Sequence, residues 1–428
     1  MNIDIFNKAL LPLAITLALG SSAASAAVLV QCPGDKDGSA IIGDAGGETA
    51  NPDIKCMHLT AGDGFTTMAD GTTRYMFGFA DVTGLPTKTP TQKNNLIQAG
   101  VLAHEWPGPT IELEQGQEFY LSLTNVGMMM RPDLFDPHTV HFHGFPQSST
   151  VFDGLPESGL SIGMGATLTY YYKLNDPGTY MYHCHVEATE HMQMGMLGNL
   201  YIKAAQNKTG CEDLSCAATT GTAGYAYNDG DGSTYYDVDY PIQLGSFDGA
   251  FHDASENTQP LPFALMEDNY PMINGRGYPD TVDMKTDGEA SIYDPTGALD
   301  PFPVPDGFNN TYVHTGQPVS SLITANAGEK VLLRISNLAI TRFYTLQSLG
   351  IPMQVVGKDA KLLRTVDGET NLYYNTNSVT IGGGESFDVI LDTTNVAAGT
   401  YYLYTANLNY LSNDTEEFGG MMTEIVIN

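Results

Sequence analysis

The chain is predicted to fold into two β-sandwiches, and three observations lead to this expectation. Short runs rich in Val, Ile, Thr, Tyr and Leu recur between clusters of Gly, Pro, Asn and Asp. No long segment has convincing helical periodicity, and no short repeat of fixed period favours a propeller. The length of 428 residues suits two or three domains of ordinary size.

Seven strands can be placed from these runs, each bounded by turn-forming residues. The runs are Thr110 to Leu113, Glu118 to Leu123, Thr167 to Tyr172, Leu200 to Lys203, Lys330 to Ile335, Ser378 to Ile381 and Tyr401 to Thr405. Their content of β-branched and aromatic residues is typical of strands rather than helices.

A polar segment divides the strands into two groups. Residues 206–239 are rich in Thr, Gly, Asn, Asp and Ser, which is typical of a linker. We therefore expect an amino-terminal extension at 28–90, a first sandwich at 91–205 and a second at 240–428.

A weak internal repeat supports this division. Each half has a turn followed by a strand that ends in Thr-Asn or Ser-Asn, and each has a Gly-Thr-Tyr strand near its end.

The amino terminus predicts export. Lys8 precedes an apolar run from Ala9 to Gly20, and a stretch of small residues extends to Ala27, so residues 1–27 have the pattern of a cleaved secretory signal. No later stretch approaches the roughly 20 apolar residues that a membrane helix needs. We expect a soluble protein without a membrane span, in the periplasm or secreted.

Composition and charge exclude several function classes. Hydrophobic residues make up 42% of the chain and charged residues 16%, which excludes a disordered chain and a coiled coil. The 18 Lys and Arg residues face 49 Asp and Glu residues, so the formal charge is -31. Such a surface repels a phosphate backbone, and nucleic acid is not an expected partner.

Five cysteines in an exported protein leave one unpaired. Parity alone allows any of the five to be the free thiol. The simplest arrangement joins the two near neighbours Cys211 and Cys216, and joins Cys32 to Cys56 in the Gly- and Asp-rich amino-terminal segment. Cys184 is then the free thiol.

Two short segments concentrate the residues that bind metals, with six of the chain's ten histidines. These are His138, His141 and His143 in residues 137–144, and His183, His185 and His191 in residues 182–196. Within each segment two histidines alternate with one other residue, so both face the same side of a strand. Cys184 lies between one such pair and faces the opposite side.

This alternation can build two adjacent metal sites from one strand. Cys184 can join His138, His191 and Met196, and two imidazoles, a thiolate and a weak thioether suit a blue-copper electron-transfer centre. The other site is lined by His141, His143, His183 and His185. The alternative is that single histidines are structural and that Met192, Met194 and Met196 pack in the core.

These segments resemble the multicopper oxidase family, whose domains are cupredoxin-like Greek-key β-sandwiches. The first segment is similar to the family's His-x-x-His-x-His-Gly motif, and His183-Cys184-His185 with His191 and Met196 is similar to its carboxy-terminal copper motif. Pro107 to Ile111 looks like the opening strand of the family's first domain. The resemblance implies type 1 copper at His138, Cys184, His191 and Met196. It implies an oxygen-reducing copper cluster, of type 2 and type 3 copper, at His141, His143, His183 and His185.

The chain departs from the family pattern in two places. Five residues separate His185 from His191, where laccases have three. The family's trinuclear cluster uses four His-x-His pairs, whereas this chain supplies two. After residue 200 the sequence contains only His252 and His314, and neither is in a pair.

Three interpretations follow from these departures. In the first, two chains appose their amino-terminal domains in a homo-oligomer and complete an oxidase cluster that takes oxygen as acceptor. In the second, the chain resembles copper nitrite reductases, with His143, His183 and a neighbouring chain's His252 or His314 around a type 2 copper. His141 then stands where that family has a catalytic Asp. In the third, only the type 1 site fills, and the protein is an electron carrier or copper-binding module. In each electron-transfer interpretation the electron donor is a small molecule or a redox protein.

Taken individually, the remaining histidines are interpreted as structural rather than as metal ligands. His58, His104, His252 and His314 are each interpreted as surface or capping residues. The segment Met128 to Met130 is interpreted as packing near the first histidine segment.

Overall fold

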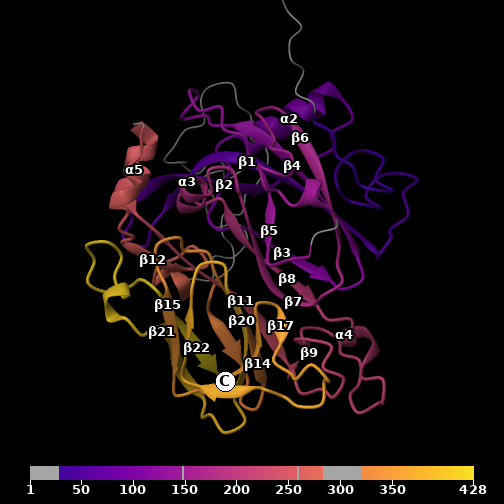
Figure 1. The fold of residues 1–428 in the computed structure, drawn as a ribbon, viewed down its shortest axis with the longest axis vertical. Helices are drawn as coiled ribbons and strands as arrows, with labels where there is room; N and C mark the ends of the chain where they lie inside the picture. The colour runs from indigo at the N-terminus through magenta and orange to yellow at the C-terminus, as the bar shows by residue number, and fades with distance from the viewer. Residues whose placement is uncertain (1–27, 147–148, 258–259, 283–319) are drawn as a thin grey trace, which may run out of the picture.

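The computed structural model describes residues 28–146, 149–257, 260–282 and 320–428, and it contains two β-sandwiches side by side (Figure 1). The prediction of an all-β fold is confirmed. Each of the seven predicted runs lies in a strand. These strands are β3 (Gly108–Glu114), β4 (Glu118–Gly127), β6 (Thr167–Lys173), β8 (Leu197–Lys203), β14 (Lys330–Asn337), β19 (Ser378–Ile381) and β21 (Gly399–Thr405).

The first sandwich pairs two four-stranded sheets. One sheet has the order β2-β1-β4-β6 and the other β3-β8-β7-β5. The further strands are β1 (Ile54–Thr67), β2 (Thr73–Asp81), β5 (His141–His143) and β7 (Gly178–His183). β1 runs parallel to β4, and β3 runs parallel to β8, while the other neighbours are antiparallel.

The amino-terminal boundary of the first sandwich differs from the expectation. Residues 28–90 are expected to be an extension, but β1 and β2 lie within this range and form half of one sheet. The Cys32–Cys56 disulfide ties the preceding loops to the start of β1. Local patterns miss β1 because its glycines resemble a loop and its partner β4 lies more than fifty residues away in the chain.

The second sandwich repeats the connectivity of the first. Its sheets have the orders β12-β11-β14-β20-β16-β17, with β18 also paired to β16, and β13-β22-β21-β15-β19. The further strands are β11 (Val238–Phe247), β12 (Tyr270–Ile273), β13 (Ile323–Ala325), β15 (Tyr344–Leu349), β16 (Met353–Lys358), β17 (Lys361–Leu362), β18 (Tyr374–Thr376), β20 (Ser386–Asp392) and β22 (Met422–Ile427). β11 is parallel to β14 as β1 is to β4, and β13 is parallel to β22 as β3 is to β8. The internal repeat in the sequence therefore reflects two copies of one fold.

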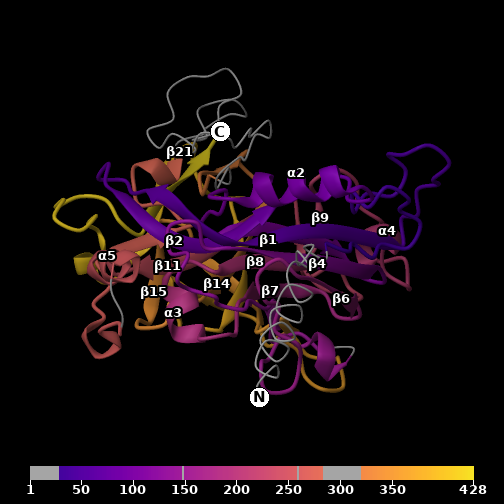
Figure 2. The ribbon, with the colours of Figure 1, turned by 90° about the horizontal axis from the view of Figure 1, so that it is seen from above.

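Helices and the connecting segment lie around the sandwiches. The helices are α2 (Pro90–Gly100), α3 (Ala188–Gln193), α4 (Gln206–Thr209) and α5 (Gly249–Asn257), with short 3-10 turns at Thr150–Phe152, Phe263–Leu265, Asp280–Val282 and Leu408–Tyr410. α2 lies over the outer face of β1 (Figure 2). The predicted linker contains α4, the Cys211–Cys216 disulfide and a small hairpin of β9 (Gly224–Tyr225) and β10 (Tyr235–Tyr236). None of the helices in the described ranges is both long and apolar enough to span a bilayer.

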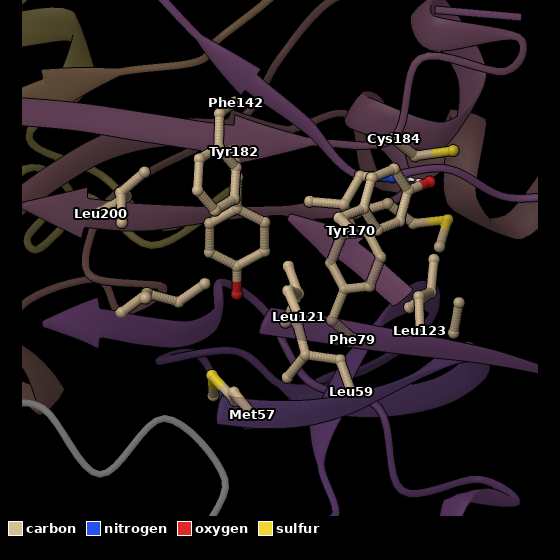
Figure 3. Packing of buried hydrophobic residues seen from close by; sticks show 14 of the residues in the cluster. Met57, Leu59, Phe79, Leu121, Leu123, Phe142, Tyr170, Tyr182, Cys184 and Leu200 are labelled. Carbon is tan, nitrogen blue, oxygen red and sulfur yellow. Dashed lines mark hydrogen bonds between the residues drawn. The ribbon is translucent and has the colours of Figure 1, made fainter. Parts of the chain in front are cut away.

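The hydrophobic core of the first sandwich includes Cys184, one of the predicted metal ligands. Phe142 and Tyr182 of one sheet face Leu59 and Leu121 of the other, and all four side chains are buried (Figure 3). Cys184 belongs to the same cluster and is fully buried just beyond the end of β7. Close packing of the two sheets thus fixes the neighbouring strands β5 and β7, which carry the two histidine pairs.

The two sandwiches are held together by buried polar contacts. The hydroxyl of Thr179 in β7 donates to Asp388 of β20 at 2.6 Å, and the hydroxyl of Ser386 donates to the carbonyl oxygen of Thr179 at 2.7 Å. The guanidinium of Arg334, fully buried in β14, lies 4.7 Å from the centre of the Tyr201 ring in β8. The second sandwich therefore packs on the strands that form the histidine sites.

Candidate metal centres

The first group of predicted ligands converges in the interior of the first sandwich. The Nδ1 atom of His191 lies 3.3 Å from the Sγ of Cys184, and the Nδ1 of His138 lies 4.0 Å from it. His138, Cys184 and His191 each offer one ligand atom, and these three atoms all lie within 4.8 Å of one another. All three side chains are buried. Two imidazole nitrogens and a soft sulfur at this spacing fit a copper ion of the blue type.

A one-turn helix returns the chain from Cys184 to His191. The extra residues in this loop form the start of α3, and Glu187 before it adopts a left-handed conformation with φ of 43°. The backbone N–H of Cys184 then donates to the carbonyl of Met196, and the N–H of Met196 donates to the carbonyl of His191. These bonds hold the predicted axial residue, Met196, beside the other three, and its side chain is fully buried.

Charge favours the deprotonated sulfur in this group. Burial raises the pKa of the Cys184 thiol, but His191 and the N–H of Thr139 outweigh burial, so the pKa lies below its ordinary value. Burial lowers the pKa of His191, yet the Cys184 sulfur and Asp136 raise it to about 10. The pKa of His138 lies well below its usual value because the ring is completely buried. The thiolate is the form of cysteine that binds metals.

The second group lies on β5 and at the end of β7, where His183 and His185 alternate with Cys184. His141, His143 and His183 each offer a nitrogen within 4.8 Å of the others. His141 pairs with His183 across β5 and β7, and the two rings are 5.3 Å apart. The ring of His185 lies 5.3 Å from that of His141 and 5.6 Å from that of His183. The four predicted histidines are thus neighbours, with three of them in the tightest cluster.

Hydrogen bonds orient two of these rings toward the cluster. The Nδ1–H of His141 donates to the carbonyl of Asp153 at 2.6 Å, and the Nδ1–H of His183 donates to the carbonyl of Cys184 at 2.8 Å. Their Nε2 atoms are left as the ligand positions. Burial lowers the pKa of His183 to about 3 and lowers those of His141 and His143. The rings are therefore neutral near pH 7, the state in which imidazole binds metals.

Three further residues support these groups through backbone or side-chain atoms, and local sequence patterns did not identify them. Thr139 donates its backbone N–H to the Cys184 sulfur at 3.5 Å, and its hydroxyl accepts the N–H of His185 at 3.0 Å. Asp153 orients His141, and a carboxylate oxygen of Asp136 lies 3.8 Å from the Nε2 of His191. The position of Thr139 directly after His138 is a sequence signal that could have identified it, whereas Asp153 and Asp136 carry none.

The expectation of surface or capping roles for the other histidines is wrong for three of them. His58, His104 and His252 are buried, with exposures of 0%, 1% and 0%. The Nδ1 of His252 lies 2.6 Å from the carbonyl oxygen of Tyr75, and its Nε2 lies 2.9 Å from that of Gln193. Burial lowers the pKa of this ring to about 4, so near pH 7 it is neutral and its single N–H donates to one of the two carbonyls. His314 lies outside the described residues.

Comparison with protein families identifies both halves of the chain. A family model described as multicopper oxidase matches residues 87–207, and a second model with the same description matches residues 252–428. Together they cover most of the chain.

Curated relatives agree with these matches. The chain is 25% identical over 305 residues to copper resistance protein A of Escherichia coli, an alignment that covers 69% of this chain and 43% of the relative. It is 39% identical over 80 residues to multicopper oxidase MmcO of Mycobacterium tuberculosis, covering 19% of this chain and 14% of the relative. The chain thus spans less than half the length of these relatives.

Solved structures share the fold. The blue copper oxidase of Nitrosomonas europaea superposes with a TM-score of 0.59 at 21% identity, covering 87% of this chain and 86% of that chain. The copper nitrite reductase of Nitrosomonas europaea superposes with a TM-score of 0.52 at 14% identity, covering 88% and 94%. With both family models matched, the chain belongs to the multicopper oxidase family, whose metal is copper.

Proposed function

We propose that this protein is an exported copper oxidoreductase that takes single electrons at the Cys184 group and passes them to the four-histidine group, where oxygen is reduced. The observation that carries this proposal is the position of Cys184 between His183 and His185, whose rings lie in the second group while its sulfur lies in the first. One tripeptide therefore connects the two groups by a short covalent route.

Copper at these positions would supply one-electron redox chemistry at the first group and oxygen reduction at the second. The residues of the chain prepare both positions. His138, Cys184, His191 and Met196 are proposed to hold one copper in a buried pocket, where packing limits rearrangement between redox states. His183 also donates its Nδ1–H to the carbonyl of Cys184, which adds a hydrogen-bonded path to the covalent one.

The second group must be completed by further ligands to form a three-copper cluster, because the chain has only two His-x-His pairs. We propose that a second copy of the first sandwich supplies them, in a homo-oligomer. The partial exposure of His141, His143 and His185 favours this arrangement, since part of each ring stays open to a partner. The electron donor is proposed to be a small molecule or a redox protein.

The nitrite-reductase interpretation loses one of its two candidate ligands. His252 is fully buried, and both of its ring nitrogens face backbone carbonyls of its own chain, so neither is open to a neighbouring chain's copper. That interpretation now depends on His314 alone. The electron-carrier interpretation requires only the first group and remains the second candidate function.

Export to the periplasm or beyond is proposed from the oxidised cysteines. Both predicted disulfides, Cys32–Cys56 and Cys211–Cys216, are present, and Cys184 is free and buried. Structural disulfides of this kind are typical of proteins that fold outside the reducing cytosol. The predicted signal, residues 1–27, lies outside the described residues.

Two variants that differ in their effect on the visible band test the proposal. His141→Ala should keep the intense visible band of a copper thiolate but stop oxygen consumption with a phenolic or metal-ion donor. Cys184→Ser should abolish both the band and oxygen consumption. His58→Gln is the control, because His58 is a histidine of the same sandwich that lies outside both groups and whose ring bonds to Thr124, and the variant should keep both properties.

Copper content separates the candidate functions. A twofold dimer sharing one three-copper cluster should bind about 2.5 coppers per chain, a nitrite-reductase-like protein about two and a carrier about one. A fully loaded protein with one copper per chain that consumes no oxygen would refute the oxidase proposal in favour of electron transfer. A colourless, oxidised, copper-loaded protein would refute the type 1 assignment.

A further inference from the structure

A glycine turn of the second sandwich lies against one histidine of the second group. The turn connects β19 to β20 and consists of Gly382, Gly383 and Gly384. A Cβ atom built on Gly384 would lie 2.7 Å from the Nε2 of His143 and 3.0 Å from its Cε1. Real Cβ atoms do not approach another heavy atom this closely, so only a residue without a side chain allows the present position of the ring.

Hydrogen bonds hold the Gly382–Gly384 turn in place, so the turn presents a fixed surface to the ring of His143. The side chain of Asn337, fully buried at the end of β14, donates to the carbonyl of Ile381, and its backbone carbonyl accepts the N–H of Gly384 at 2.8 Å. A carboxylate oxygen of Glu385 accepts the N–H of Gly382 at 2.7 Å, while the other accepts a bond from Lys358 at 2.9 Å. The imidazole of His143 is the free end of a side chain and is the part that would move.

The contact forms part of the packing between the two sandwiches. Gly178, at the start of β7, lies close to Ala360, which follows the second sandwich's Asp359 in a tight turn. The carboxylate of Asp359 also interacts electrostatically with His143. The second sandwich therefore contributes two features that act on His143, namely the fixed Gly382–Gly384 turn and the negative charge of Asp359.

We propose that the Gly382–Gly384 turn of the second sandwich is a positioning element for His143, and that it controls metal occupancy of the four-histidine group in the first sandwich. This inference rests on the proposed function insofar as His143 binds copper there. Under this proposal the second sandwich, which has no His-x-His pair in its sequence, helps to position a ligand of the metal site. The contact joins residues 241 positions apart in the chain.

The test substitutes Gly384 and compares it with a glycine of the same backbone conformation. Gly384 has φ of +87°, and Gly328 in the same sandwich has φ of +96° with no heavy atom within 4 Å of a built Cβ. Gly384→Ala and Gly328→Ala therefore share the cost of a left-handed alanine. Only Gly384→Ala also pushes on His143.

The metal measurement uses the copper-loaded protein. We expect Gly384→Ala to lose most of its non-blue copper, measured by total copper and electron paramagnetic resonance, while the blue band keeps its intensity. Gly328→Ala should retain both. If Gly384→Ala retains the non-blue copper of the wild type, the inference is overturned. If the wild type itself binds only the blue copper, the proposed oxidase function fails instead.

A second measurement needs no metal. In copper-free protein, Gly384→Ala should lower the denaturant midpoint more than Gly328→Ala does. In a His143→Ala background the two substitutions should lower it equally, because the ring that meets the new Cβ is gone. Equal effects of the two substitutions in the wild-type background would overturn the positioning role even if the copper centre proves as proposed.

Discussion

The buried Arg334 should be the most costly single charge to remove from the boundary between the sandwiches. Its Nε donates to Asp239 at 2.8 Å, its Nη1 lies 3.9 Å from a carboxylate oxygen of Asp388, and its side chain has no exposure. Arg334→Met would keep much of the volume but leave two carboxylates without a cation. Breaking a buried ion pair in this way costs about 3 to 5 kcal/mol.

An exposed ion pair between the two sandwiches provides the control. Lys361 in β17 lies 3.5 Å from Asp176, and the two side chains are 70% and 45% exposed. Exposed pairs contribute about 0 to 1 kcal/mol, so Lys361→Met should change the free energy of unfolding by no more than that. The expected difference between the two variants is then at least about 2 kcal/mol, roughly a thirtyfold change in the unfolding equilibrium.

The only tryptophan of the chain makes this difference measurable. Trp106 is buried in the first sandwich, and its ring centre lies 4.6 Å from that of Phe247 in the second. Its fluorescence in a urea titration of copper-free, disulfide-intact protein should therefore report separation of the sandwiches. Equal midpoints for Arg334→Met and Lys361→Met would refute the view that the buried cation compensates Asp239 and Asp388.

Two further predictions concern cysteine and histidine chemistry. Denatured, non-reduced, copper-free protein should release one titratable thiol per chain, from Cys184, and three or five would contradict the disulfide pairing. His58 has its pKa lowered to about 3 by burial, so the unfolded chain takes up a proton below about pH 6.5 that the folded chain does not. Stability should therefore fall as pH decreases from 6.5 toward 3, by up to about 1.4 kcal/mol per pH unit from this residue. His58→Gln should reduce that slope, and an unchanged slope would contradict the assignment.

The parts of the structure that were predictable depend on short stretches of sequence. The seven strands and both disulfides follow from local composition and spacing, and the two ligand groups follow from alternation along one strand. The parts that were missed depend on remote partners. β1 is stabilised by pairing with β4, and Gly384 meets His143 only because the sandwiches pack together. Histidines such as His252 were misjudged because the segments that bury their rings, here the ones around Tyr75 and Gln193, are distant in the chain.

The duplicated fold explains why the second sandwich cannot complete the histidine group from its equivalent position. Gly178 pairs with Ile202 in the first copy as Gly399 pairs with Ile427 in the second, so β7 corresponds to β21. Counting along these strands places Tyr404 at the position of His183.

The cross-strand partners then differ in chemistry. His183 faces His141 across the first sheet, whereas Tyr404 faces Gln347, and the amide of Gln347 donates to the hydroxyl of Tyr404. Amide and phenol groups that bond to each other leave no imidazole nitrogen for copper, which prefers nitrogen and sulfur donors. Since the second copy retains the pairing but not the ligands, histidines that complete the group are best sought on a second copy of the first sandwich. The second sandwich of the same chain then acts on the group through the turn at Gly384 rather than through ligands at the equivalent strand positions.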